Sequence, residues 1–290
     1  MRGPVTGRIA DSGTTGEGSS KWGAAFHCLQ LYSYSKVLQI LNVQKTVFDL
    51  GSAFHLQFAQ RALAIRDGAD AWETDQDAIY QAGLEKGFYH RLPVEYESDL
   101  WAMCDADAKL TPWWRKIMAV EEPMALEFGP LDCPGHEGHG KPIRYNPRID
   151  LAEEDSKGMV WIDDHKTGAH PTLSLADAYS MDFQFLMMRL IGKTYYGDRF
   201  GGVRVHFVQS KPPYKCDIVS LETADRSVPW AAGRIGQRFV QMAHDVAWLE
   251  TETAAGRLSA WDWPACMRQE VCFHRYGKCD GWQYCAWGPK

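Results

Sequence analysis

One nine-residue stretch, Val160 to Gly168, constrains the fold more than any other part of the sequence. In a β-strand, successive side chains point to opposite faces. Asp164 and Lys166 would then share one face with apolar neighbours, while Asp163 and His165 would share the other. An acid and a lysine side by side near the end of an apolar strand suggest a chemical site. A β-hairpin whose charges face water explains the same spacing equally well.

A second run of residues, 143 to 149, also has the pattern of a strand and leads into Asp150. Two strand ends that each carry an aspartate, one followed by a lysine, suit a metal-dependent site that cleaves phosphodiesters. Mg²⁺ prefers oxygen ligands, and a bound divalent ion polarises a phosphoryl group and acidifies water. Asp150 and Asp164 are therefore candidate metal ligands, the backbone carbonyl of His165 is a further one, and Lys166 is the candidate to orient the attacking water.

The remaining pattern predicts an α/β protein with a mixed β-sheet flanked by helices, a helical N-terminal portion and a C-terminal appendage. Helices are expected over 24–43, 51–67, 74–90, 95–119, 173–196 and 229–253, a short β-prone link over 46–50, and strands over 124–128, 143–150, 158–166, 203–209 and 216–221. We expect a flexible tail over 1–21, one domain over 22–258 and a cysteine-rich element over 259–290.

Composition limits the class of protein. No stretch approaches 18 consecutive apolar residues, so no transmembrane helix or membrane contact is expected. The Gly-, Ser- and Thr-rich N-terminus lacks the apolar segment of a signal peptide, which predicts a cytoplasmic protein. The formal net charge of −6 gives no general affinity for nucleic acid, so any DNA contact needs a local basic strip.

The residues around the two aspartates resemble the PD-(D/E)XK nuclease superfamily. The resemblance is carried by Arg148-Ile149-Asp150 and by Ile162-Asp163-Asp164-His165-Lys166-Thr167-Gly168. The most similar branch is that of the RecB-like nucleases, including those of CRISPR adaptation and of phages. This resemblance implies a restriction-endonuclease-like core and a deoxyribonuclease that uses Mg²⁺ or Mn²⁺. It also implies an exonuclease that acts in recombination, repair or processing of DNA.

The same branch implies two further site residues. It has a histidine on an upstream helix in a Gly-x-x-x-His context, and Gly51 to His55 fits that pattern, so His55 is implied as a third metal ligand. It also has a glutamine on a downstream helix, which makes Gln184 a contact to the active-site lysine or to DNA. The sequence departs from the branch at Met188, where a tyrosine is expected, and at Pro147, where glycine is frequent.

Of three further acidic residues near these motifs, two are weaker candidates and one is excluded. Glu121 or Glu122, at the start of the strand region, would assist the metal site, but a solvated acidic turn is the simpler interpretation. Asp163 lies next to Asp164 in sequence but on the opposite face of the expected strand, so it is excluded from the site.

The C-terminus carries three cysteines, Cys272, Cys279 and Cys285, that look like metal ligands in a compact loop. A fourth ligand is needed for either zinc or a [4Fe–4S] cluster. On spacing alone, a zinc site completed by Cys266 is competitive, although the absence of a C-x₂-C pair weakens it. RecB-like nucleases with a cluster place one cysteine ahead of the nuclease core and three at the C-terminus. The resemblance therefore implies a [4Fe–4S] cluster whose fourth ligand is Cys28.

The resemblance makes DNA the expected partner, as single strands or at its ends, together with recombination or CRISPR-type proteins. Arg144 and Arg148 are expected on the Asp150 face, where they would contact phosphates. No base-reading module is visible, so contacts to the DNA backbone are the expectation. Two alternatives stay open: a non-hydrolytic DNA-binding or assembly subunit that keeps the fold, and a nuclease that acts on RNA.

Overall fold

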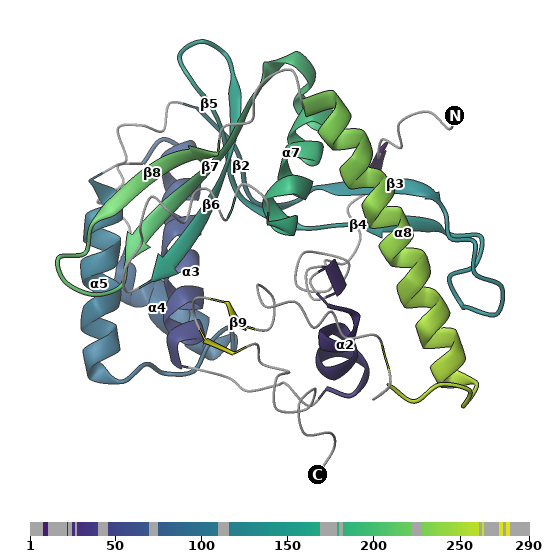
Figure 1. Ribbon diagram of the computed structural model, residues 1–290. Coiled ribbons are helices and arrows are strands. Elements are labelled where there is room, and N and C mark those ends of the chain that lie inside the picture. The colour runs from purple at the N-terminus through teal and green to yellow at the C-terminus, as the bar shows by residue number, and fades with distance from the viewer. Residues whose placement is uncertain are drawn as a thin grey trace. The chain divides into compact units, whose positions relative to one another are not determined.

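The structure is a computed structural model of the 290-residue chain. It describes residues 8–10, 22, 25–26, 28–39, 46–69, 75–109, 116–168, 179, 182–221, 228–260, 263, 273–274 and 277–278. Contacts divide the chain into two compact units. The first is drawn from residues 1–43, 124–147 and 225–290, and the second from 44–123 and 148–224. Each unit contains its own β-sheet (Figure 1).

The second unit is built on a five-stranded mixed sheet in the order β2-β5-β6-β7-β8. The strands are β2 (Lys116–Pro123), β5 (Arg148–Glu154), β6 (Val160–Gly168), β7 (Phe200–Gln209) and β8 (Cys216–Leu221). Within this sheet β6 and β7 are parallel, and the other neighbouring strands are antiparallel. A parallel pair needs a crossover connection, and the chain between β6 and β7 contains α7 (Phe183–Tyr196) followed by the short helix η4 (Gly197–Arg199).

Helices cover both faces of this sheet (Figure 1). One face carries α3 (Thr46–Arg66), α4 (Gln76–Glu85) and α5 (Val94–Ala108), and the other carries α7. Phe54, Phe58 and Leu100 of the helices form one core with Leu151 and Val208 of the strands. Burial of such large apolar side chains is the main favourable contribution to folding. The second unit is therefore an α/β arrangement with a mixed sheet flanked by helices.

The first unit contains a three-stranded antiparallel sheet in the order β1-β3-β4. Its elements are β1 (Arg8–Ala10), α2 (Leu29–Tyr32), the π-helical turn η2 (Ser33–Val37), β3 (Ala125–Pro130), β4 (Pro142–Tyr145), α8 (Val228–Ala254), β9 (Phe273–His274) and β10 (Gly277–Lys278). Phe239 of α8 packs its ring against Phe128 and Tyr145 of the sheet, with centroids 5.0 and 5.7 Å apart. In the described part of the chain, no helix is both long and apolar enough to cross a membrane.

Several element boundaries differ from the sequence prediction. The expected β-prone link over 46–50 is the first turn of α3, because Leu50 continues the buried helical face of Ala53 and Phe54. The helix expected over 95–119 ends at Ala108, and Lys116 begins strand β2. The strands expected over 203–209 and 216–221 and the helix over 229–253 are confirmed within a few residues.

The prediction of a single strand over 143–150 is wrong, and this changes where the site residues lie on their strands. This segment forms β4 and β5, which belong to different sheets and are separated by Asn146 and Pro147. Asp150 is therefore inside β5 and Asp164 inside β6, and neither ends its strand. The expected placement of Arg144 beside Asp150 on one strand is also wrong, since Arg144 lies on β4 and pairs with Glu127 of β3.

A buried ion cluster links three strands of the second unit. The β6–β7 register places Asp163 beside Arg204, whose guanidinium donates to both carboxylate oxygens at 2.6 and 2.7 Å. Arg204 also pairs with Glu153 of β5, and it lies 5.1 Å from the Trp161 ring. Burial alone would raise the pKa of Asp163, but the hydrogen bonds from Arg204 and the nearby His206 imidazole lower it to about 2. Asp163 is thus an ionised structural residue, as its exclusion from the site requires.

Replacing the buried arginine is expected to destabilise the fold strongly. Arg204→Met leaves two buried carboxylates without their cation, which should lower the free energy of unfolding by about 3–5 kcal/mol in urea denaturation. Arg199→Met is the matched control, because Arg199 pairs with Glu154 at 3.2 Å with its side chain 56% exposed, and surface pairs contribute about 0–1 kcal/mol. Equal losses in the two variants would contradict a structural role for the buried cluster.

Candidate metal centre

A cleft of about 720 Å³ opens in the second unit beside α3. Its lining includes His55, Glu121, Arg148 and Asp150, which come from α3, β2 and β5. Nitrogen and oxygen ligands from three elements therefore face one solvent-accessible space. Two of them, His55 and Asp150, are residues that the sequence assigned to a metal site.

Three side chains in the cleft form a possible metal-binding group. One ligand atom each from His55, Glu121 and Asp150 lies within 4.8 Å of the other two. His55 Nδ1 is 3.4 Å from Asp150 Oδ2. An imidazole with two carboxylates is a donor set for a divalent cation such as Mn²⁺, and the carboxylates suit Mg²⁺.

Glu121 is the member of this group that sequence analysis did not favour. It lies between the strand pairs Val120–Leu151 and Glu122–Ile149, which places it opposite Asp150. Its φ of 49° is in the left-handed region, which is uncommon for a residue other than glycine and is often found at functional sites. Glu122 is exposed, so the solvated interpretation holds for Glu122 but not for Glu121. No local sequence signal separates these two acids.

The electrostatics of Glu121 and Asp150 differ although the two are neighbours. Burial, with the charge of Asp150, raises the pKa of Glu121 to about 7. Burial would also raise the pKa of Asp150, but His55, His165 and Lys166 outweigh it and hold that pKa well below its usual value. Asp150 is therefore ionised. The ionised form of Glu121 would be stabilised by any positive charge added to the group.

Asp150 also organises the neighbouring strand. The pairing of β5 with β6 ends at the pair Leu151 and Asp163. Next to this pair, Asp150 Oδ2 accepts a hydrogen bond from the His165 backbone N–H at 2.9 Å. The N–H and C=O groups of one strand residue point to the same side, so the His165 carbonyl also faces β5. This carbonyl is the one that the sequence analysis named as a further candidate ligand. The His165 imidazole is buried instead, with its ring centroid 3.6 Å from that of Phe58.

Asp164, Lys166 and Gln184 form a second cluster, on the α7 face of β6. Lys166 Nζ lies 2.7 Å from Asp164 Oδ2 and donates to Gln184 Oε1 at 3.1 Å. Gln184 Nε2 donates to Asp164 Oδ1 at 2.5 Å. The side chain of Asp182 caps α7 by accepting from the Gln184 backbone N–H at 2.8 Å, which fixes the start of the helix. Gln184 thus contacts the lysine, as the resemblance implied.

The charge state of this cluster follows from its burial. Burial raises the pKa of Asp164 to about 6, with a further contribution from the charge of Asp150, although Lys166 opposes the shift. Burial would lower the pKa of Lys166, but Asp164 and Asp150 outweigh it and raise that pKa. Lys166 is therefore a protonated ammonium group whose direction is set by a hydrogen bond to Gln184 and an ion pair with Asp164. Asp164 lies beside the His55–Glu121–Asp150 group and is not one of its three members.

The cysteines expected to bind a cluster are mostly outside the described residues. Cys28 is described and buried, with 8% of its surface exposed. Cys266, Cys272, Cys279 and Cys285 lie outside the described residues. Among the described residues, neither of the two groups of metal-ligating side chains contains a cysteine.

Comparison of the sequence with protein-family models and with curated proteins finds no match. The function is therefore inferred from the chemistry and geometry of the cleft.

The choice between the two adjacent glutamates is directly testable. Glu121→Gln should weaken Mn²⁺ binding by roughly tenfold or more, since even outer partners of metal ligands contribute this much, whereas Glu122→Gln should leave the affinity unchanged. Mn²⁺ titration followed by electron paramagnetic resonance measures both. Equal affinities in the two variants would remove Glu121 from the metal centre.

Proposed function

We propose that this chain is a metal-dependent deoxyribonuclease, an exonuclease similar to the RecB-like branch of the PD-(D/E)XK superfamily. The observation that carries the proposal is the convergence of His55, Glu121 and Asp150 in an open cleft, beside the paired Asp164 and Lys166. The mixed sheet flanked by helices is compatible with a restriction-endonuclease-like core. The alternatives remain a DNA-binding subunit without hydrolytic activity and a nuclease that acts on RNA.

In the proposed site, one cluster binds the metal ion and the other orients the reacting groups. His55, Glu121 and Asp150 would hold Mg²⁺ or Mn²⁺, with Asp164 and the His165 carbonyl as further ligands. The Asp164 carboxylate accepts one hydrogen bond, from Gln184, and forms an ion pair with Lys166, so it keeps further lone pairs for an ion. The ion supplies polarisation of the phosphoryl group and a more acidic water. The chain orients the attacking water, in particular through Lys166.

Lys166 is the proposed positioning group for the attacking water. Its ammonium is held by Asp164 and Gln184 and lies 5.4 Å from the centre of the Phe185 ring. A fixed positive charge in a partly buried site stabilises the negative charge that develops on phosphoryl oxygens, and it needs no reorganisation during the reaction. Gln184 acts through Lys166 and Asp164 and would be a positioning residue.

The cleft also offers features that suit a nucleic-acid strand. Phe88 lines it with 58% of its surface exposed, although large aromatic side chains are usually buried. Arg148, also in the lining, has its side chain 55% exposed. An exposed ring is a platform on which an unpaired base stacks, and a guanidinium binds phosphate. These features favour single-stranded DNA or frayed ends as the substrate.

The [4Fe–4S] cluster expected at the C-terminus remains part of the proposed function. Cys28, Cys272, Cys279 and Cys285 would hold a [4Fe–4S] cluster, with zinc as the alternative. The burial of Cys28 is compatible with a ligand role. No step of the proposed hydrolysis involves this group.

Cleavage of end-labelled DNA tests the proposed activity. With Mg²⁺ or Mn²⁺ the protein should shorten linear DNA, and chelation should stop the reaction because the ion supplies the acidic water. Lys166→Ala should slow single-turnover cleavage by about 10²-fold or more, the usual effect of removing a charge-stabilising group. Lys193→Ala, which removes an exposed lysine paired with Asp198, should have no effect.

Three outcomes of this assay would decide against the proposal. DNA binding without metal-dependent cleavage supports the non-hydrolytic alternative. Faster cleavage of RNA than of DNA supports the RNA alternative. Full activity in Lys166→Ala would show that another site performs the reaction.

The exposed ring predicts a strand preference. Phe88→Ala should weaken binding of single-stranded DNA by about 1–3 kcal/mol, the range for loss of one base–aromatic stack, while Phe88→Tyr should retain it. Fluorescence anisotropy with single- and double-stranded oligonucleotides measures the difference. An equal loss for both substrates would contradict base stacking at Phe88.

A further inference from the structure

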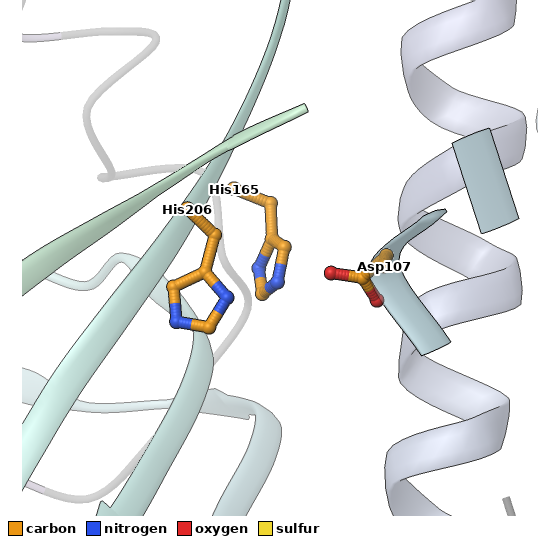
Figure 2. Close-up of side chains that lie close together, drawn as sticks. All are labelled: Asp107, His165 and His206. Carbon is orange, nitrogen blue, oxygen red and sulfur yellow. The ribbon is translucent and has the colours of Figure 1, made fainter. Parts of the chain in front are cut away.

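A second group of metal-ligating side chains lies in the interior of the second unit. One ligand atom each from Asp107, His165 and His206 lies within 4.8 Å of the other two. All three residues are buried, with 0–1% of their surface exposed. Figure 2 shows the two imidazoles side by side and the Asp107 carboxylate directed toward them. His165 and His206 are paired residues of β6 and β7, and Asp107 comes from α5.

The two imidazoles have no hydrogen bond that accounts for their burial. Both ring nitrogens of His165 and both of His206 are buried without a hydrogen-bond partner. A neutral imidazole has one N–H donor and one lone pair, and leaving such groups unpaired in the interior destabilises the fold. Two such rings side by side, with four unpaired nitrogens, indicate a shared ligand between them.

Neighbouring carboxylates orient the two rings. His206 Nε2 lies 3.4 Å from Asp163 Oδ1, and His165 Nδ1 lies 3.8 Å from Asp150 Oδ2. Metal-bound histidines generally direct their second nitrogen to a carboxylate, which fixes the tautomer. This arrangement leaves Nδ1 of His206 and Nε2 of His165 as the nitrogens available to a common ion.

Asp107 is the third member of the group, and Cys216, which lies beside Asp107 and outside the group of three, is the candidate for a fourth ligand. Arg61 pairs with Asp107 Oδ2 and donates to the Cys104 carbonyl at 3.1 Å, so it holds the carboxylate in a fixed direction. The other oxygen, Asp107 Oδ1, lies 3.7 Å from Cys216 Sγ. Cys216 is opposite Val208, two residues from His206 on the same face of β7. Two imidazoles, a carboxylate and a thiol form a donor set typical of zinc.

We propose that Asp107, His165, His206 and Cys216 form a structural zinc site in the interior of the second unit. The ion joins α5 to β6, β7 and β8, and it satisfies imidazole nitrogens that are otherwise unpaired. Bound Cys216 would be a thiolate, whose negative charge offsets that of the ion next to the buried Arg61. Zinc binding here requires neither the proposed nuclease activity nor the C-terminal cysteines.

Zinc content of the full-length protein provides the first test. After metal removal, the protein is incubated with Zn²⁺ in an excess of Mg²⁺, and bound zinc is measured by elemental analysis. His206→Gln should hold one zinc per chain fewer than the wild type. His90→Gln, which changes a histidine whose side chain is 74% exposed, should match the wild type. Equal zinc content in wild type and His206→Gln overturns the proposal, because ions bound at other sites are common to both.

A second variant keeps the proposal testable if His206→Gln does not fold. Cys216 is only partly buried, and Cys216→Ser is nearly isosteric. Cobalt-loaded wild type should show more thiolate-to-cobalt charge-transfer absorbance than cobalt-loaded Cys216→Ser, and zinc should raise the melting temperature of wild type more than that of the variant. Identical cobalt spectra and identical zinc-induced shifts in the two proteins would refute the four-ligand site.

Discussion

The parallel pairing of β6 with β7 determines where the polar residues of the second unit can lie. Both strands are buried between helices, so each polar side chain on β6 must find a partner on its own face. Asp163 meets Arg204 across the pairing, and His165 meets His206. A slip of one residue would move Asp163 and Arg204 to opposite faces, because side chains alternate along each strand. The buried charges therefore specify the register at the same time as the register satisfies them.

The approach of α3 to this sheet depends on a small residue. A Cβ atom at Gly51 would come to 3.3 Å from Thr167 Oγ1 of β6, closer than most real Cβ contacts. His55, one turn later on the same face of the helix, reaches Asp150 from that position. The Gly-x-x-x-His spacing thus has a physical explanation in this fold: the glycine allows close packing, and the histidine uses it to reach the carboxylate.

Local sequence pattern was sufficient to assign some of the site residues to a strand face. Alternation along 160–168 separated Asp164 and Lys166 from Asp163, and the structure places Asp163 in a structural ion cluster instead. The resemblance supplied His55 and Gln184, which lie beside Asp150 and Lys166 respectively. The assignment of faces depends on the geometry of a single strand, whereas the contacts of His55 and Gln184 join different elements and were implied only by the resemblance.

The features that local sequence pattern did not predict share a cause. Glu121 joins the cleft because β2 pairs with β5 and because its backbone adopts a positive φ, and neither property is encoded in the neighbouring residues. His206 and Asp107 meet His165 only through strand register and helix packing across more than 40 residues of sequence. The single strand expected over 143–150 failed for the same reason, because its two halves pair with different partners.

His165 connects the two proposed metal sites. Its backbone N–H holds Asp150 in the cleft, while its imidazole belongs to the buried group with His206 and Asp107. A ligand that fixes the imidazole also restricts the peptide group that orients Asp150, because both belong to one residue in a paired strand. Coupling between two binding sites is reciprocal in free energy. On the two proposals, occupancy of the interior site would therefore change metal affinity in the cleft, and cleft occupancy would change the affinity of the interior site by the same factor.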